Sequence, residues 1–303
     1  GQGFGPGFTH SCEAPPGLSW AEWGGVRCHS QYGHGPLSLE GALHVSCNCY
    51  FARLGDDLGP EGLAAVCAAF GFGQPTGIES LGPGPPHLEA VPAILQWTPG
   101  ARLDRQLRRA ANGLQVLEGT PAQLARALCA LATGRLPSLQ LIERVGAQFL
   151  EPEPPLALPY SRSALDFVRQ AMVGVASERA GSAHDELAPG VIGLRIAVKT
   201  GSADLVARSL PGQAGVRRGK HTWLAGWAPA DDPRLVFVIF LHDTVATASH
   251  SAAVVGRQLF ESPEVRRFLE SEGLVLGPLG EPQDRRPAPA AAPRIPRLPR
   301  LIR

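Results

Sequence analysis

Residues 194–201 read LRIAVKTG, and residues 221–243 read HTWLAGWAPADDPRLVFVIFLHD. Both stretches gather β-branched, aromatic and other apolar residues in runs of strand length, and the prolines and aspartates of residues 229–233 are typical of a turn. The sequence therefore predicts three strands, over residues 194–201, 221–230 and 234–243, with a tight hairpin between the second and the third.

Helical patterns surround these strands. Residues 119–134 form the clearest one, because Thr120 can cap a helix and Pro121 suits its first turn. Apolar residues recur at helical spacing in other segments, and we expect helices over residues 37–58 with a break near the middle, 59–73, 163–178 and 251–260. Residues 1–36 are rich in Gly, Pro, Ser and His and are expected to be loop. Helices, then an antiparallel sheet, then a closing helix predict an α+β (mixed α/β) fold.

Composition and charge exclude several classes of function. The chain has 303 residues and a formal net charge of +1, which does not favour nucleic acid as its main partner. No apolar run approaches the roughly 18–20 residues that span a bilayer, and the longest compact run, residues 235–241, has the length of a strand. The chain opens with Gly1 rather than Met, so we expect it to be processed or cut from a longer protein.

The C-terminal segment differs in composition from the rest. Residues 277–303 hold six arginines against Glu281 and Asp284 and are dominated by Pro, Ala and Arg. Such a segment cannot bury enough apolar surface to order itself. We therefore expect a folded region over residues 1–276 and a disordered tail over residues 277–303, with a basic interaction tail as the alternative.

Lysine is rare in this chain. Of 28 cationic Lys and Arg residues only Lys199 and Lys220 are lysines. Lysine is a compact point charge whose pKa shifts readily, whereas arginine stays charged and prefers flat bidentate contacts. Because Lys199 ends an apolar run in a composition that otherwise uses arginine, it marks a candidate site.

Two short motifs supply groups for catalysis. Lys199 is followed by Thr200, Gly201 and Ser202 at a strand end, where the glycine allows a substrate backbone to approach and the two hydroxyls can bind a carboxylate. Lys199 can hold a neighbouring hydroxyl ready for proton transfer. Ser46 and Asn48 lie at the break between two expected helices, where the serine could be that hydroxyl and the asparagine could contact a substrate amide. A solvated strand end and a helix cap are the alternatives.

The six cysteines are too few for a disulfide scaffold at this length. Cys12 and Cys28 flank a loop and could form a disulfide in an oxidising compartment, while unpaired thiols are the plainer alternative. A zinc site that adds Cys47 and Cys49 is a third alternative, but its C-x-C pair lacks the usual C-x₂-C spacing. We therefore expect no metal and no cofactor, and we interpret His34 as structural.

Five segments resemble, in the same order, the transpeptidase domain of penicillin-binding proteins, which are relatives of the serine β-lactamases. They are HGPLSLEGALHVSCNCYFARLGDDLG, FGFGQPTGI, ANGLQVLEGTPAQLARALCALATG, AVKTGSADL and HTWLAGWAPADDPRLVFVIFL. The resemblance runs from about residue 24 to residue 272 and is of the monofunctional, class B type. It implies the penicillin-binding transpeptidase fold, with an antiparallel sheet flanked by helices, incomplete at its N-terminus.

The resemblance also implies a function, D,D-transpeptidation of D-Ala-D-Ala stem peptides by serine acyl transfer, and binding of β-lactams. Ser46 would shuttle protons, Asn48 would contact the substrate amide, and Lys199 would lie near Ser46 and the nucleophile. Thr200 and Ser202 would bind the carboxylate of the stem peptide or the β-lactam. Members of the family are membrane-anchored on the extracytoplasmic side and work with partners in cell-wall synthesis, so the same is expected of the parent protein.

One element of the family pattern is missing. The nucleophile motif is S-x-x-K, and the two lysines would require a serine at position 196 or 217, where Ile196 and Arg217 stand. We therefore expect the motif to precede Gly1 in a longer chain and these 303 residues to be inactive alone. A relative that binds peptidoglycan peptide or a protein partner without catalysis is the second hypothesis, and an unrelated zinc or disulfide module is the third.

Overall fold

In the computed structural model a three-stranded antiparallel sheet lies at the centre of the fold, with strand order β13-β12-β9. The structure describes residues 7–14, 20–78, 95, 97–114, 116–205, 208–209, 216–217, 219–244 and 251–280. The strands of the sheet are β9 (Ala197–Asp204), β12 (Lys220–Ala228) and β13 (Leu235–Thr244). Shorter strands lie around it: β1 (Thr9–Glu13), β2 (Glu22–Trp23), β3 (Val26–Arg27), β4 (Gly33–Ser38), β5 (Arg135–Leu136), β6 (Arg144–Val145), β7 (Gln148–Phe149), β8 (Leu156–Ala157), β10 (Arg208–Ser209) and β11 (Val216–Arg217).

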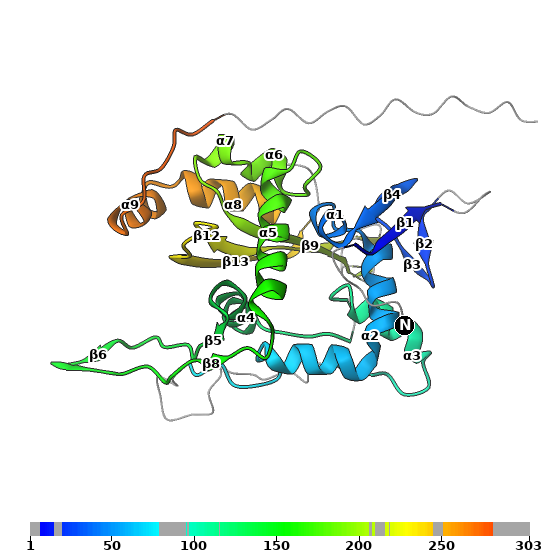
Figure 1. Ribbon diagram of the computed structural model, residues 1–303, viewed down its shortest axis with the longest axis horizontal. Helices are drawn as coiled ribbons and strands as arrows, with labels where there is room; N and C mark the ends of the chain where they lie inside the picture. The colour runs from blue at the N-terminus through cyan, green and yellow to red at the C-terminus, as the bar shows by residue number, and fades with distance from the viewer. Residues whose placement is uncertain are drawn as a thin grey trace, which may run out of the picture.

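Helices cover both faces of this sheet (Figure 1). The helices of the described part of the chain are α1 (Leu39–His44), α2 (Asn48–Ala69), α3 (Leu103–Ala110), α4 (Pro121–Thr133), α5 (Arg162–Ser177), α6 (His184–Leu187), α7 (Pro189–Ile192), α8 (Ala252–Glu261) and α9 (Pro263–Ser271). Successive residues of a strand point to opposite faces. Leu224 therefore packs toward α8 in one core, while Ala225 and Trp227 pack toward α4 and α5 in another.

The expected sheet is confirmed. Ala228 pairs with Leu235 across the turn at residues 229–233, and β9 pairs antiparallel with β12 through Lys199 opposite Ala225. The expected helix over residues 119–134 is also confirmed as α4, because Thr120 and Gln123 form a reciprocal capping box and Gly134 ends the helix in the left-handed conformation. The mixed α/β fold class predicted from the sequence is therefore correct.

One expectation about the N-terminal third is wrong. Residues 1–36 are not all loop, because β1 pairs with β4 in register from Thr9 opposite Ser38. Gly33, with φ +87°, lets β4 come close to β1, since a Cβ there would overlap the carbonyl oxygen of Cys12. The expected helix that begins at residue 59 is confirmed, because Gly59 has a non-helical backbone with φ +73° and ψ 169°, which divides α2 into two helices at a kink.

The expectation of a loop failed because the polar and glycine-rich residues 1–36 contain short strands that pair with one another. The expected tail, residues 277–303, lies for the most part outside the described residues. Among the helices described, none is both long and apolar enough to cross a bilayer.

Candidate active site and a cluster of thiols behind it

The turn between α1 and α2 carries Ser46 and Asn48. Ser46 has a left-handed backbone with φ +56°, which is uncommon for a residue other than glycine. The turn is held by hydrogen bonds from the Ser46 and Cys47 amides to the carbonyls of Leu43 (3.3 Å) and Ala42 (2.9 Å). Residues 46–48 form one side of a cleft, and we call this side the turn wall.

The opposite side is formed by residues 199–202 of β9, here called the sheet wall. The Nζ atom of Lys199 donates hydrogen bonds to Ser46 Oγ and to the carbonyl oxygen of Thr200, both at 2.8 Å. Burial disfavours the charged form of an amine, and it lowers the pKa of Lys199 from 10.5 to about 8. A lysine with such a pKa exchanges a proton with a neighbouring hydroxyl more readily than an exposed lysine does.

The remaining residues of the sheet wall are hydroxyl-bearing or small. Thr200 Oγ1 lies 2.6 Å from Ser182 Oγ, and Ser202 is exposed to solvent. Gly201 stands opposite Trp223 in β12, and a Cβ at Gly201 would come within 3.3 Å of the Trp223 Cβ. A side chain at this position would therefore crowd the sheet as well as the cleft.

The structure brings all the predicted site residues to one cleft. Two adjoining hollows of about 350 and 380 Å³ share Ser46, Asn48 and residues 200–202 as lining residues. Lys199 lines the first hollow and Lys220 the second, so both lysines of the chain lie at the cleft.

Two further residues at the cleft were missed by sequence reasoning. Ser182 lines the second hollow, its hydroxyl lies beside Thr200 Oγ1 of the sheet wall, and its backbone N–H donates to the carbonyl of His44 at the end of α1 at 2.9 Å. Asn112 lines the first hollow and donates its side-chain amide to the carbonyl of Asn48 at 3.2 Å. The only local signal was Gly181 before Ser182, where a Cβ would overlap the carbonyl oxygen of Val175.

Asn48 has one side-chain contact that fixes its amide. Its Nδ2 atom donates to the carbonyl oxygen of Arg27 at 2.9 Å. With the nitrogen engaged there, Oδ1 is the atom that remains to accept a hydrogen bond from a substrate N–H.

Behind the turn wall lies a group of metal-ligating side chains, here called the thiol–histidine cluster: Cys12, Cys28, His34, Cys47 and Cys49. The donor atoms of the first four all lie within 4.8 Å of one another. His34 Nδ1 is 3.4 Å from Cys28 Sγ and 3.7 Å from Cys12 Sγ, and Cys28 Sγ is 4.0 Å from Cys47 Sγ. The β1–β4 pairing explains part of this, because it sets Cys12 opposite Gly35, next to His34.

Contacts between the side chains of the cluster shift their pKa values. Hydrogen bonds with the thiols of Cys12 and Cys28 raise the pKa of His34 to about 9, and contact with Cys12 lowers the pKa of Cys28. The Cys49 thiol also interacts with those of Cys12 and Cys28, which raises its own pKa. A disulfide between Cys12 and Cys28 is not formed, since all six cysteines are free thiols.

These donors could hold a metal ion. Thiolate and imidazole are the ligands that zinc prefers, and four ligands at zinc–sulfur and zinc–nitrogen distances stand about 3.6–3.8 Å apart in a tetrahedron. The distances from Cys28 Sγ to His34 Nδ1 and Cys47 Sγ and from Cys12 Sγ to His34 Nδ1, which are 3.4, 4.0 and 3.7 Å, are close to these values, and all four donor atoms lie within 4.8 Å of one another. The residues present therefore fit zinc. The set of donors differs from the four cysteines considered from the sequence, because it includes His34.

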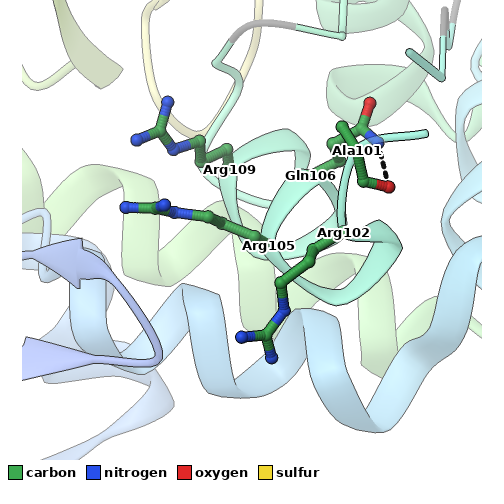
Figure 2. Close-up of a pocket in the computed structure, with 5 residues that line it drawn as sticks. All are labelled: Ala101, Arg102, Arg105, Gln106 and Arg109. Atoms are coloured by element: carbon green, nitrogen blue, oxygen red, sulfur yellow. Dashed lines mark hydrogen bonds between the residues drawn. The ribbon is translucent and has the colours of Figure 1, made fainter. Parts of the chain in front are cut away.

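A third hollow, of about 280 Å³, lies on α3 and is lined by Ala101, Arg102, Arg105, Gln106 and Arg109. Figure 2 shows the three guanidinium groups spreading in different directions from the helix rather than converging on one point. Gln106 donates its side-chain amide to the carbonyl of Ala101 at 3.4 Å, a contact within the loop and helix themselves. The arrangement offers no focused site for an anion.

Comparison with known proteins places the chain in a family. The sequence profile of the penicillin-binding protein transpeptidase domain matches residues 10–261. Peptidoglycan D,D-transpeptidase MrdA of Haemophilus influenzae is 26% identical over 248 residues, which are 76% of this chain and 36% of that protein. Stage V sporulation protein D of Bacillus subtilis is 29% identical over 261 residues, which are 79% of this chain and 36% of that protein. The chain thus spans little more than a third of the length of these relatives.

Solved structures show the same fold. The penicillin-binding protein PBP2 of Helicobacter pylori in complex with MreC matches with a TM-score of 0.67 and 19% identity, over 89% of this chain and 46% of that one. The PBP2 of Pseudomonas aeruginosa in complex with WCK 5153 matches with a TM-score of 0.64 and 22% identity, over 89% of this chain and 56% of that one. At such identities the likeness supports the architecture and not the roles of single residues.

Proposed function

This chain belongs to the penicillin-binding protein transpeptidase domain family, and we propose that its cleft works in peptidoglycan D,D-transpeptidation on stem peptides that end in D-Ala-D-Ala. The observation that carries the proposal is the 2.8 Å hydrogen bond from Lys199 Nζ to Ser46 Oγ, which joins two motifs 153 residues apart. A buried lysine on a serine hydroxyl is an arrangement for moving a proton.

The proposed reaction is acyl transfer through a serine ester. A serine supplied by sequence outside these 303 residues attacks the carbonyl carbon of the D-Ala–D-Ala bond, the C–N bond breaks, and the terminal D-Ala leaves with a proton on its nitrogen. The amine of a second stem peptide then attacks the ester, forms the new amide and releases the serine. In β-lactams the strained amide takes the place of the peptide bond.

Each wall of the cleft has a role in this reaction. On the turn wall, Ser46 relays the proton between the nucleophile and the leaving nitrogen, and Asn48 accepts a hydrogen bond from the substrate amide. On the sheet wall, Lys199 holds the Ser46 hydroxyl and supplies positive potential, and the hydroxyls of Thr200 and Ser202 bind the substrate carboxylate. Gly201 lets the substrate backbone run close along β9.

The edge of the sheet suits an extended substrate. β9 pairs with β12 on one side, and no other described strand pairs with it on the other side. An extended stem peptide could add to this free edge through backbone hydrogen bonds, as peptides do in strand addition. The parent protein is proposed to act at the extracytoplasmic side of the cell membrane together with cell-wall synthesis proteins.

A second candidate is a module that binds the stem peptide, or a protein partner, without catalysis. It is favoured by one observation, the lack of an S-x-x-K motif in these 303 residues. The PBP2 of Helicobacter pylori was solved in complex with MreC, so a related protein forms a protein complex.

Intact mass after incubation with a penicillin separates the two candidates. The measurement uses these 303 residues and a version extended upstream through the first S-x-x-K in the parent gene. We expect only the extended protein to gain the mass of the drug. If neither protein is acylated while both are folded, the transpeptidase proposal is wrong and the binding module remains. If the 303 residues react alone, the nucleophile lies within them, and Ser46 is the first residue to replace.

A further inference from the structure

One buried hydroxyl at the cleft has no hydrogen-bond partner. Thr222 on β12 is 5% exposed, and its Oγ1 atom makes no hydrogen bond within the described part of the chain. The other buried side-chain atoms in this condition belong to ion pairs, His44 with Glu40 and Arg257 with Glu186. An unpaired buried hydroxyl destabilises a fold, and valine has a similar shape without one. Packing alone therefore does not explain a threonine at this position.

The strand register sets Thr222 among the hydroxyls of the sheet wall. Thr222 lies opposite Ser202, and Leu224, two residues further along β12, lies opposite Thr200. Residues opposite each other on paired strands share one face of the sheet, as do residues two apart on one strand. Because Leu224 packs in the core that contains α8, the side chains of Thr200, Ser202 and Thr222 all lie on that face.

The N-terminus of α8 meets this face of the sheet (Figure 1). Gly256 allows the helix to lie close to β12, since a Cβ there would overlap the side chain of Leu224. Ser251 caps α8 and accepts the N–H of the third residue of the helix at 3.4 Å. The N–H groups of Ala252 and Ala253 have no acceptor inside the helix. Both alanines line the second hollow, as Thr222 does.

These groups suit a negatively charged oxygen. The first turn of a helix presents N–H groups and a partial positive charge, which together favour anions. The hydroxyls of Thr200, Ser202 and Thr222 can each donate one hydrogen bond. The described residues that line the second hollow include no Asp or Glu, so no carboxylate of the protein competes for these donors there.

We propose that Thr222 donates a hydrogen bond to the carboxylate of the substrate, and that Thr222 and the first turn of α8 form the inner part of the carboxylate site. The inference rests on the proposed function, which gives the carboxylate to Thr200 and Ser202, and it adds a donor from a second strand. Rotation about the Cα–Cβ bond exchanges the methyl and hydroxyl of a threonine, so the hydroxyl can turn toward an acceptor in the hollow that Thr222 lines.

This arrangement makes Thr222 a specificity-determining residue. A substrate with a carboxylate gives its hydroxyl the partner that the free protein lacks. A ligand that is neutral at the same point leaves the hydroxyl with a weaker acceptor, and sites with unpaired buried polar groups reject such ligands strongly. Thr222 therefore costs stability in the free protein and increases the preference for a carboxylate in the complex.

Peptide binding tests the proposed contact. We would titrate the 303-residue chain with N-acetyl-D-Ala-D-Ala and with its C-terminal amide, following both by nuclear magnetic resonance. The unaltered chain should bind the acid more tightly than the amide. Thr222→Val should weaken binding of the acid about 10-fold and leave that of the amide unchanged, because the lost hydrogen bond goes to a charged group. Thr222→Ser keeps the hydroxyl and should keep the preference for the acid.

Thermal unfolding without ligand gives a second, independent readout. Thr222→Val should raise the midpoint by roughly 2–4 °C, since it removes an unpaired buried hydroxyl. Thr133→Val on α4 is the matched control, because the Thr133 hydroxyl donates to the carbonyl of Cys129 at 2.8 Å. This control should lower the midpoint and leave both peptide affinities unchanged. If Thr222→Val lowers the midpoint as well, its hydroxyl is already paired in the free chain and the proposal is wrong.

The outcomes separate this inference from the proposed function. If the folded, unaltered chain binds neither peptide, the proposed function and the inference are both wrong. If the chain prefers the acid and Thr222→Val keeps the full preference, only the role of Thr222 is wrong. Should Thr222→Val not fold, Thr222→Ser and Thr222→Ala form a second pair that differs by the hydroxyl alone, and an equal preference in these two variants would overturn the inference.

Discussion

The two walls of the cleft differ in what supports them. The sheet wall belongs to β9, which is sandwiched between two large apolar cores that contain Leu224 on one face and Trp227 on the other. The turn wall rests instead on the thiol–histidine cluster and a single large buried side chain, Tyr50. Apolar burial stabilises a fold in proportion to area, so the sheet wall is firm by packing alone.

This difference assigns different tasks to the two walls. The sheet wall carries the charged and hydroxyl groups that we propose bind the substrate, and the hydrophobic cores on both faces of the sheet support it. The turn wall carries Ser46 in a left-handed backbone, a conformation that costs about 1 kcal/mol or more and persists only where the surroundings enforce it. We therefore expect the turn wall to depend on the thiol–histidine cluster and the sheet wall on apolar packing, and the predictions below test this contrast.

The largest effect is expected from Lys199→Ala in the upstream-extended protein. Loss of the group that holds Ser46 Oγ should lower the rate constant of β-lactam acylation about 10²–10⁴-fold, the usual contribution of a positioned acid or base. Stopped-flow acylation with a chromogenic cephalosporin measures it. Lys220→Ala is the matched control, because this lysine is half-exposed and paired with Asp204 at 3.4 Å. Equal effects of the two changes would remove Lys199 from the mechanism.

The sheet wall was largely predictable from the sequence, because its residues are neighbours in the chain. Lysine, threonine, glycine and serine stand next to one another in β9, so a four-residue pattern contains most of the site. The strands and α4 were predictable for a similar reason, since alternation, the Thr120 cap and Gly134 act within a few residues. Ser46 and Asn48 were found because they also form a short motif.

The thiol–histidine cluster was not predictable in this way. Its donors come from four elements, and the spacing of Cys12, Cys28 and Cys47 matches no usual zinc pattern. His34 joined the set only because β4 pairs with β1, in a region expected to be loop. Ser182 was missed for the same physical reason, because its contacts to Thr200 and His44 are tertiary. Sequence patterns reveal the geometry of residues that are close together in the chain. Contacts between distant segments become visible only in the three-dimensional structure.

The next effect concerns the charge buried in the sheet wall. The folded-state pKa of Lys199 is about 8, against 10.5 when unfolded, so between these pH values the unfolded chain binds more protons than the folded one. The free energy of unfolding should therefore rise with pH from about 8 to about 10.5, by roughly 3 kcal/mol from this lysine alone.

Lys199→Met is the variant that isolates this contribution. Urea unfolding at several pH values should show the unaltered chain gaining stability relative to the variant across that window, since the titration of tyrosines and cysteines is common to both. If the difference in the free energy of unfolding between the two proteins stays constant from pH 8 to pH 10.5, burial does not lower the pKa of Lys199. The sheet wall would then be more exposed to water than we infer.

A smaller effect is expected from chelating a metal ion at the thiol–histidine cluster, whose residues fit zinc. If zinc is present at about 100 times its dissociation constant, chelation should weaken the N-terminal unit by about 2.7 kcal/mol, which corresponds to about 100-fold faster exchange of amides that open with it. Hydrogen–deuterium exchange with and without a strong chelator should show the change in peptides that cover residues 45–50. Peptides that cover β9 should not change. If chelation speeds amide exchange equally in peptides from both walls, the idea that only the turn wall depends on the ion is wrong.

The smallest predicted effect is at Ser182, which contacts the sheet wall and the end of α1. Its hydroxyl lies 2.6 Å from Thr200 Oγ1, and its amide donates to the carbonyl of His44, two residues before Ser46. Ser182→Ala removes only the hydroxyl contact, a hydrogen bond worth about 1 kcal/mol, so acylation by carboxylate-bearing β-lactams should slow about 5- to 10-fold through weaker binding. Because the amide contact remains, the free energy of unfolding and the zinc content should stay the same.

The comparison with a Thr200→Val variant sharpens this prediction. If Ser182 acts by orienting the Thr200 hydroxyl, then the effect of Ser182→Ala should vanish once that hydroxyl is gone, and the double variant should equal Thr200→Val. Additive losses would mean that Ser182 binds the carboxylate directly from its place in the second hollow. In that case the site for the carboxylate is not confined to β9, and the segment after α5 belongs to the sheet wall as a third contributor.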